Sequence, residues 1–488
     1  FISVNDYKSP FYTYISSFFY LIFGGGELTI RLPAAIFGSL IILAVYSLTL
    51  KLLENENVAL MSSFLTAVSP FEIFFSRKSF ENVIGIFFML AGFTLLLLYV
   101  RKKSTKFILL SNFSLGIAIY TYYSHVIIVP LLLMMFIWIY REFFLKNLRQ
   151  ILHFGLLLIL LCPLLIIIMS NPASRYRSSD VFVIQDINLG RNIDSAKSTN
   201  QFINFFARNK AIFDFSFNRY LEQFNFAFIF GNGLDFTDQG LLDMGPLLLM
   251  QFPFLILGTV YLVKLKNHTK EKKFILAWII LGMLPSGLTF EQHSPHRSIM
   301  VFTMLNIISA AGLVFFFDYL RSVNIRILTY RFILTISIAV FSVNYLYFIH
   351  MYFVNFPFEK SQYLHYPFKQ VAKFAWKHHD EFDQIIFDPL FGEIAPVVGT
   401  AAHYYLAYYG GYPPAKFQKE HKGGSKEREM LFDKFSIRKI DWREDRNLRN
   451  VLLIGSPWSL PIETIDKSEI INTFYFYNHK EAFYAVKL

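Results

Sequence analysis

The sequence predicts an α-helical polytopic membrane protein with a small α/β domain at its C-terminal end. Three observations support this prediction. Of the 488 residues, 54% are hydrophobic, and the mean hydropathy is +0.41, a composition typical of membrane proteins. Apolar runs of spanning length recur as far as residue 350, with short basic clusters between them. After residue 353 the pattern changes to short amphipathic and strand-like segments.

Ten segments reach or approach the roughly 20 apolar residues that a helix needs to cross a hydrocarbon core of about 30 Å. They are Arg31–Leu53, Val58–Phe75, Val83–Val100, Phe107–Tyr122, Val126–Tyr140, Ile151–Met169, Pro246–Val263, Phe274–Phe290, Ser298–Phe317 and Phe332–His350. An earlier apolar piece, Phe11–Phe23, is shorter and ends at Gly24-Gly25-Gly26. It predicts a helix that lies at the membrane interface. We therefore expect about ten spans.

Basic residues in the short loops predict the orientation. Clusters such as Arg101-Lys102-Lys103 and Lys264–Lys273 fall on alternate loops. Because cytoplasmic loops carry an excess of lysine and arginine, these loops are assigned to the cytoplasm. The external face then holds Phe1–Ile30, the longer loops and everything after Met351. We expect a multi-pass plasma-membrane protein whose C-terminal domain is extracytoplasmic.

This topology divides the chain into three parts. Residues 1–30 are an external loop and interfacial helix, residues 31–350 are the transmembrane domain, and residues 351–488 are the extracytoplasmic α/β domain. An external insertion at residues 170–245 mixes aromatic runs with charged residues, so we expect short helices on the membrane surface. In the C-terminal part, Phe368–His378 has helical spacing, and Gln384–Phe387, Asn450–Ile454 and Phe483–Val486 have the composition of strands.

Composition excludes several other classes of protein. The net charge of +11 is compatible with nucleic-acid binding, but the basic residues lie in short clusters between spans, which is a topology signal. No nucleic-acid partner is therefore expected. The chain has neither a phosphate-binding loop nor a GxGxxG motif after a strand, so a soluble nucleotide substrate is not expected either. The single cysteine, Cys162, allows no intrachain disulfide.

Polar groups at span ends on the predicted external face are the candidates for function. An ionisable group near hydrocarbon is costly unless it is paired or used. Asp6 and Lys8 lie ahead of the first apolar piece, and a solvated loop is the equally weighted alternative. Arg77 and Glu81 are four residues apart and could pair along one helix face, which would also suit a plain ion pair at a span end.

Two further groups follow on the same face. Tyr122 and His125 lie in an aromatic run that an interfacial belt would explain without any function. His293 and His296 resemble metal ligands, but Pro295 interrupts a helix that would bring them together, so no metal is expected. Arg297 opens the next span at headgroup depth, where its planar guanidinium suits a phosphate. A positive anchor is the alternative, although anchors favour the other face.

These groups predict a cavity for a lipid phosphate. The cations are Lys8, Arg77 and Arg297, and the carboxylates are Asp6 and Glu81. A cation there would stabilise the phosphate as a leaving group, and a carboxylate would act as general base toward an acceptor hydroxyl. No cofactor is expected. The bilayer would deliver the substrate.

Several runs of residues, in this order, are shared with a known enzyme family. They are Asp6–Tyr12, Glu27–Gly38, Ser69–Arg77, Tyr120–Ser124, His293–Ser298, Tyr366–Lys369 and Pro413–Phe417. In their order they resemble membrane glycosyltransferases of family 39 and their aminoarabinose-transferase-like relatives. The resemblance implies a GT-C fold. It also implies transfer of a sugar from a polyprenyl-phosphate donor on the outer face, without a metal.

The resemblance also implies roles for individual residues. In that family, the lysine of a lysine–proline loop contacts the lipid phosphate, a role that would fall to Lys8. Here Ser9 separates this lysine from Pro10, which departs from the usual adjacent pair. An arginine and a following acid of the family map to Arg77 and Glu81. We expect Lys8 and Arg297 to bind the donor phosphate.

The catalytic base is not expected within this sequence. The family's catalytic acid lies in the first external loop after the first span, which would precede Phe1, so we expect an N-terminally truncated chain. Asp6 is at best a weak candidate for the base. The alternatives to an enzyme are a non-enzymatic transporter of lipids or lipid-linked sugars, and an inactive scaffold. Polar groups crowded at one end of the spans favour the enzyme over a transporter, whose polar groups lie near the midplane.

Overall fold

The computed structural model describes residues 2–3, 6–7, 9–145, 166, 182–195, 200–231, 240, 243–289, 295–323, 325–420, 422–423 and 430–488. These residues form two compact units. The helical unit is Ser9–Ile349, and the C-terminal unit is His350–Leu488. Two short strands near the start of the chain, β1 (Ile2–Ser3) and β2 (Asp6–Tyr7), pair in an antiparallel manner and are grouped with the second unit.

The helical unit begins with α1 (Pro10–Phe23), and its end confirms the stop predicted at the three glycines. Pro10 opens the helix, where its missing N–H would have had no partner. Gly24 closes it with φ +75°, and its N–H donates to the Tyr20 carbonyl at 2.9 Å. A glycine is favoured there because it has no Cβ to clash at positive φ.

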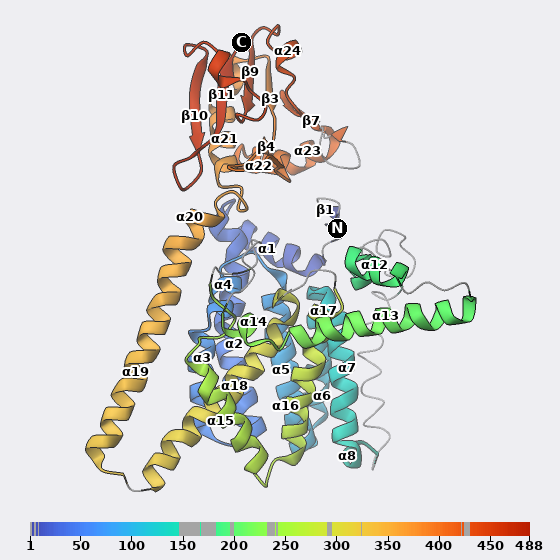
Figure 1. Cartoon of the computed structure of the whole chain (residues 1–488), viewed down its shortest axis with the longest axis vertical. Helices are drawn as coiled ribbons and strands as arrows, with labels where there is room; N and C mark the ends of the chain where they lie inside the picture. Colours follow the sequence, from blue (N-terminus) through green and yellow to red (C-terminus); the bar gives the residue numbers. More distant parts are fainter. Residues whose placement is uncertain are drawn as a thin grey trace. The chain divides into compact units, whose positions relative to one another are not determined.

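Most of the long helices of this unit run side by side, whereas α19 diverges from the others (Figure 1). They are α2 (Glu27–Leu53), α5 (Glu81–Lys102), α6 (Thr105–Thr121), α7 (Tyr123–Ile139), α15 (Gln251–Lys264), α16 (Thr269–Gly282), α18 (Pro295–Ser322) and α19 (Ile327–His350). Shorter pieces are α8 (Arg141–Leu145), the 3-10 turn η1 (Val183–Gln185) and α17 (Leu284–Gly287).

The predicted number of about ten spans is not confirmed. Among the described residues, α2, α5, α18 and the helix that starts with α19 are long and apolar enough to cross a membrane, and a bent pair of helices makes a possible fifth span. The helices α6, α7, α15 and α16 have only 14 to 17 residues. The predicted span Ile151–Met169 lies outside the described residues, apart from Ile166.

The predicted span Val58–Phe75 is broken into two helices, α3 (Glu56–Ala67) and α4 (Pro70–Ser76), with a bend of 56°. Pro70 causes the break, because a proline donates no hydrogen bond and its ring crowds the preceding residue. Ser69 is accordingly extended, with φ −64° and ψ 126°. The predicted span is therefore not one continuous helix, and the apolar run on both sides of the proline conceals the bend.

Two glycines let α15 and α18 cross closely. A Cβ on Gly258 would lie 1.8 Å from the carbonyl oxygen of Ile308, and one on Gly312 would lie 1.9 Å from the carbonyl oxygen of Phe254. Small residues that let backbones approach are the usual means of holding helices together in a bilayer, where lipid tails are as apolar as leucine. This crossing holds α18 in place, and α18 carries part of the candidate site at its first turn.

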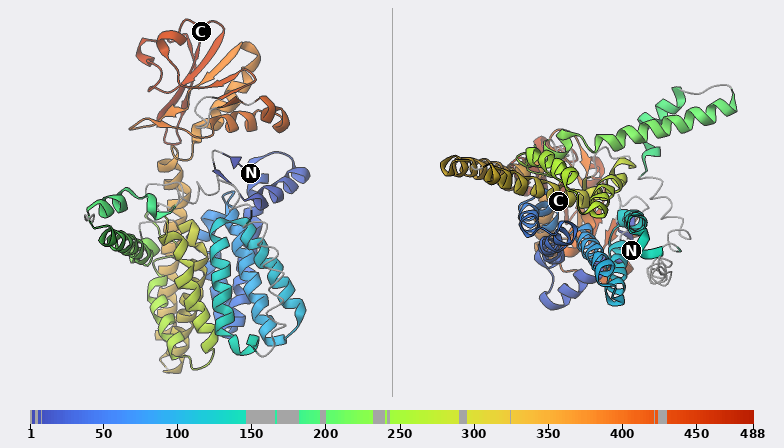
Figure 2. Two further views of the ribbon diagram at one scale, coloured as in Figure 1. Left: turned by 90° about the vertical axis from the view of Figure 1, so that its right-hand side faces the viewer. Right: turned by 90° about the horizontal axis from the view of Figure 1, so that it is seen from below.

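The insertion at residues 170–245 contains α12 (Ile187–Ser195), α13 (Gln201–Glu222) and α14 (Phe226–Phe230). The prediction of only short helices is wrong, because α13 has 22 residues. Figures 1 and 2 show α13 running across the direction of the long helices and projecting sideways from them. Its C-terminal end is attached to the bundle, since the Tyr220 hydroxyl donates to the Ile280 carbonyl of α16 at 2.9 Å.

One face of α13 is aromatic and unpartnered by the described residues. Phe202 contacts Phe206 with ring centroids 4.7 Å apart, and Phe213 stacks on Phe217 at 5.7 Å. These four rings are 47–70% exposed. Helical spacing places Tyr220 on the same face, and its side chain reaches α16. We therefore expect the aromatic face to rest on the acyl chains of the membrane.

Spin labelling tests this expectation. In a Cys162→Ser background, a label at Phe206→Cys in proteoliposomes should be more accessible to oxygen than to a water-soluble nickel complex. The control is Arg208→Cys, which is exposed and two residues further on, hence near the opposite side of the helix. Its label should show the reverse preference. Equal nickel accessibility at both positions would contradict a membrane contact, and spin–spin broadening at position 206 would indicate a second copy of the chain instead.

The C-terminal unit contains a seven-stranded sheet in the order β10-β11-β9-β3-β8-β7-β6. The strands are β3 (Gln384–Phe387), β6 (Lys422–Gly423), β7 (Met430–Phe432), β8 (Phe435–Ile437), β9 (Val451–Gly455), β10 (Ile470–Tyr475) and β11 (Glu481–Lys487), and β4 (Leu390–Phe391) pairs separately with β5 (Val397–Val398). β3 is parallel to both β8 and β9. The other pairs in the sheet are antiparallel. The predicted small α/β domain is confirmed.

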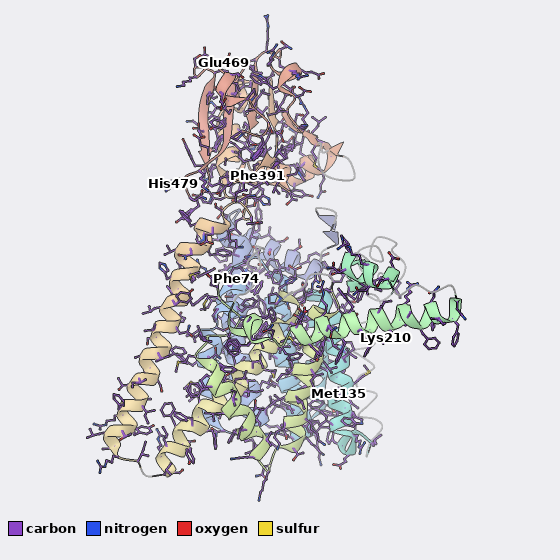
Figure 3. All side chains as sticks on the ribbon, viewed as in Figure 1. Phe74, Met135, Lys210, Phe391, Glu469 and His479 are labelled. Carbon is purple, nitrogen blue, oxygen red and sulfur yellow. The ribbon has the colours of Figure 1, made fainter. Side chains whose placement is uncertain are left out.

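Helices and turns complete this unit. They are the π-turn η2 (Met351–Asn355), α20 (Phe356–Lys360), α21 (Tyr366–Lys377), the 3-10 turn η3 (His379–Glu381), α22 (Ala402–Tyr409), α23 (Pro414–Glu420), α24 (Trp442–Asp445) and the 3-10 turn η4 (Ile462–Thr464). The side chains of the central strand β3 point alternately to the two faces of the sheet. Ile385 and Phe387 belong to the core beneath α21, and Phe391 (Figure 3) is part of that core. Ile386 belongs to a second core on the other face. Burial on both faces is usual for parallel strands.

Candidate active site

Loops at one end of the helical unit bring several predicted site residues together. α5 begins there at Glu81, and α6 and α7 meet there at Tyr122. The Ser9 hydroxyl donates to the Tyr120 carbonyl, so the start of α1 lies beside the α6–α7 turn. The first turn of α18, with His296, also reaches this end. Three of the four groups that the sequence singled out therefore meet in space.

An aromatic cluster forms the centre of this end. The ring centroid of Phe80 lies 5.8 Å from that of Tyr122 and 5.8 Å from that of His296. The Tyr122 and His296 rings are 6.5 Å apart, and the Tyr122 and His125 rings are 6.0 Å apart. The Asn82 amide donates to the His296 carbonyl, which fixes the start of α18 against α5. Mutual ring contacts of this kind hold side chains in defined orientations.

His125 is enclosed by protein and does not face lipid. Its Nδ1 atom lies 3.1 Å from the Ala118 carbonyl oxygen, which can only accept, so Nδ1 carries the proton. The Nε2 atom has no hydrogen-bond partner within the part of the chain that the structure describes. Room for the ring comes from Gly85, where a Cβ would lie 2.3 Å from the Cε1 atom of His125. His125 therefore presents an acceptor nitrogen inside the site.

The arginines and the glutamate lie around this cluster. Arg297 is half-buried in the first turn of α18, next to His296, which is buried. Arg77 is exposed at the end of α4, and Glu81 is half-buried at the start of α5. The predicted pairing along one helix face is wrong, because a turn through extended Phe80, with φ −113° and ψ 116°, separates the two helices.

Glu81 also lies near α1. The Tyr12 hydroxyl donates to the Ile30 carbonyl at 2.8 Å. Burial raises the pKa of Tyr12 to about 12, and the negative charge of Glu81 acts in the same direction. The phenol of Tyr12 therefore stays protonated, and α1, α2 and α5 meet around it. This contact links α1 to the candidate site.

Some predicted site residues cannot be placed. Lys8 and His293 lie outside the described residues, and of Asp6 only the backbone in β2 is described. Among the described residues, no group of three or more histidine, cysteine or acidic side chains is arranged to hold a metal ion. His296 lies within α18, which begins at Pro295.

Sequence reasoning missed a buried carboxyl group near the site. Glu72 of α4 is 7% exposed and accepts a hydrogen bond from the Thr303 hydroxyl of α18 at 3.2 Å. Further along α18, the Asn306 side-chain oxygen accepts from the Gln251 amide of α15 at 2.8 Å. An acidic residue inside a membrane unit is a candidate for function by default. The available signal was one glutamate within the aromatic run Pro70–Ser76.

Comparison with known proteins matches the first third of the chain to one family. Residues 7–167 match the sequence profile of the family described as dolichyl-phosphate-mannose-protein mannosyltransferase. A search of curated proteins finds no match. The profile match is therefore a similarity to that family over one third of the chain.

Two solved structures share the fold. ArnT from Cupriavidus metallidurans, bound to undecaprenyl phosphate, aligns with a TM-score of 0.52 and 13% identity over 98% of this chain and 87% of its own. The archaeal oligosaccharyltransferase AglB from Archaeoglobus fulgidus, in complex with an inhibitory peptide and a dolichol-phosphate, aligns with a TM-score of 0.51 and 14% identity over 83% of this chain. The alignment covers 55% of AglB, so this chain spans just over half of that protein. At these identities the likeness is one of fold.

Proposed function

We propose that this protein transfers a sugar from a polyprenyl-phosphate donor to an acceptor on the external face of the plasma membrane. One observation carries the proposal: Arg297, Glu81 and the cluster of Phe80, Tyr122 and His296 gather at one end of an apolar helical unit. A lipid-linked donor would reach this end of the unit through the bilayer. ArnT and AglB, which share the fold, have been solved with polyprenyl phosphates.

The proposed chemistry is a single displacement that inverts the sugar. The acceptor oxygen attacks the anomeric carbon, and the bond from that carbon to the phosphate oxygen breaks. The lipid phosphate leaves with the bonding electrons, and a carboxylate takes the acceptor proton. Arg297 and Lys8 would bind the phosphate and stabilise its growing negative charge. The base is not assigned to a described residue, and Asp6 remains a weak candidate.

The other candidates would shape the site around the donor. Tyr122, His125 and His296 would form an aromatic wall that excludes water. Arg77 and Glu81 would contact the acceptor side. Within this proposal the chain has about ten spans, and its C-terminal unit is extracytoplasmic, as the basic loops predict.

A transfer assay tests the proposal. The full-length protein in nanodiscs is given radiolabelled polyprenyl-phosphate sugars and an envelope fraction as the source of acceptors. Label should move from the lipid to an acceptor, with release of polyprenyl phosphate. Label that crosses proteoliposome membranes while still attached to lipid would indicate a transporter. Complete absence of both activities would favour an inactive scaffold.

Lys8→Ala is expected to lose most of the transfer while its insertion into the membrane is unchanged, because the donor phosphate loses a charged ligand. The control is Lys106→Ala, which removes an exposed lysine from the first turn of α6. That variant should transfer sugar at the wild-type rate. Wild-type rates in Lys8→Ala would remove this lysine from the mechanism without rejecting the enzyme.

A further inference from the structure

The C-terminal unit carries an open cleft of about 410 Å³, whereas the proposed transfer site belongs to the helical unit. Its lining comes from two segments, Asp441–Arg443 after β8 and Pro457–Pro461 after β9. β8 and β9 flank β3 and run parallel to it, so the carboxyl ends of three strands meet at one edge of the sheet. Ligands of open α/β sheets bind in the crevice at this edge. Figure 1 shows α24 beside the sheet.

A buried carboxylate fixes both walls of the cleft. Asp388 follows β3 directly and is 2% exposed. Its Oδ2 atom accepts from the Ile440 backbone N–H at 3.0 Å and from the Ser459 hydroxyl at 2.6 Å, and its Oδ1 atom accepts from the Leu390 N–H at 2.9 Å. One side chain thus ties the segment after β8 to the segment after β9. The cleft is therefore organised before any ligand arrives, which lowers the entropy that binding must overcome.

Two tryptophans line the cleft, one from each segment. The indole N–H of Trp458 donates to the Gly392 carbonyl at 2.7 Å, which sets the plane of a ring that remains 46% exposed. Trp442 is half-buried and packs against the second core, which includes Ile386 and Leu460. Trp458 therefore holds a partly exposed ring at a set angle in the cleft, where its face is available to a ligand.

The polar groups of the cleft narrow the class of ligand. Asp441 and Arg443 are exposed at its edge, and the Asp441 Oδ1 atom accepts from the Arg443 N–H at 3.0 Å, which orients the carboxylate. A carboxylate beside a guanidinium offers both acceptors and donors to neutral hydroxyl groups. A phosphate would meet the negative charge of Asp441, and a purely apolar ligand would leave both charges unused. Neutral polyols with apolar faces satisfy all these groups.

We propose that this cleft is a binding site for a neutral saccharide. A pyranose ring presents C–H groups on its faces and hydroxyl groups at its edge, so Trp442 and Trp458 would take the faces while Asp441 and Arg443 bind the hydroxyls. The volume is at the lower end of the roughly 300–1,000 Å³ of ligand pockets, which suits a unit of one or two sugar rings. The site lies wholly in the C-terminal unit and does not depend on the transfer chemistry.

Saturation-transfer NMR on the full chain in nanodiscs tests this site. The probes are the methyl glycosides of mannose, glucose, galactose and arabinose, together with maltose, cellobiose and mannobiose. At least one probe should receive saturation at its face protons. Trp458→Ala should weaken that signal by an order of magnitude or more, and Arg443→Ala should weaken it several-fold. The control, Tyr477→Ala, removes a 44% exposed aromatic ring of the same unit that does not line the cleft, and it should bind like the wild type.

Each remaining outcome overturns the proposal. It is wrong if the wild type binds none of the probes, if Trp458→Ala and Arg443→Ala bind as the wild type does, or if a nucleoside diphosphate displaces the saccharide while contacting Trp458. Thermal unfolding of each variant accompanies the binding data. Arg443→Ala keeps the test informative if Trp458→Ala fails to fold, because the Arg443 side chain is exposed. No donor lipid is present, so failure here leaves the proposed transfer untouched.

Discussion

Replacing Arg297 with alanine is expected to lower sugar transfer by about 10²-fold or more, the usual loss when one group that stabilises a developing charge is removed. The guanidinium is half-buried at the start of α18, beside the buried ring of His296. A charge that is partly withdrawn from water interacts more strongly with a departing phosphate than a solvated charge does. Initial rates of transfer at saturating and limiting donor, with size-exclusion profiles as a check on folding, measure the effect.

Two further variants serve as controls: one tests whether charge alone is enough, and the other removes an arginine elsewhere in the chain. Arg297→Lys keeps the positive charge but loses the planar fork, so its rate should lie between those of the wild type and Arg297→Ala. Arg326→Ala removes an exposed arginine just before α19, far along the chain from the candidate site, and should leave the rate unchanged. If Arg297→Ala transfers sugar as fast as the wild type does, Arg297 does not bind the phosphate.

Apolar runs encode the helical unit directly. α2, α5 and α18 contain their predicted spans because a run of about 20 apolar residues has no other stable place than a bilayer. The end of α1 at Gly24 was equally visible, since glycine accepts a positive φ. Local chemistry therefore predicted both elements. The bend before Pro70 shows the limit, because hydropathy averages over the residues that break a helix.

The sequence predicted which loops form the candidate site, but not the contacts between their residues. Span counting put four loops on one face, and three of them meet there. The contacts within it join residues far apart in sequence, such as Asn82 with His296 and Glu72 with Thr303. No local pattern specifies such pairs, since they depend on how helices pack. The saccharide cleft was missed for a related reason: Trp442 and Trp458 acquire meaning only when parallel strands bring their loops together.

The close crossing of α15 and α18 predicts the largest effect on stability. Gly312→Ala adds one methyl group, yet that carbon would lie 1.9 Å from the Phe254 carbonyl oxygen and 2.4 Å from the Gly258 nitrogen. Both are backbone atoms, so no change of rotamer relieves the clash and the helices must separate. Overpacking of this kind costs about 1–3 kcal/mol or more. We expect a clear fall in the midpoint of thermal unfolding and in the yield of monodisperse protein.

The same exchange in α12 supplies the control. A Cβ on Gly190 would have no atom within 4 Å, so Gly190→Ala should leave the unfolding midpoint unchanged or slightly higher, as alanine favours helices. Because α18 also carries Arg297, transfer by Gly312→Ala should fall together with stability, whereas Arg297→Ala should lose transfer alone. If Gly312→Ala unfolds at the wild-type temperature, the two backbones do not approach this closely, and the first turn of α18 is held at the site by other contacts, such as that between Asn82 and the His296 carbonyl.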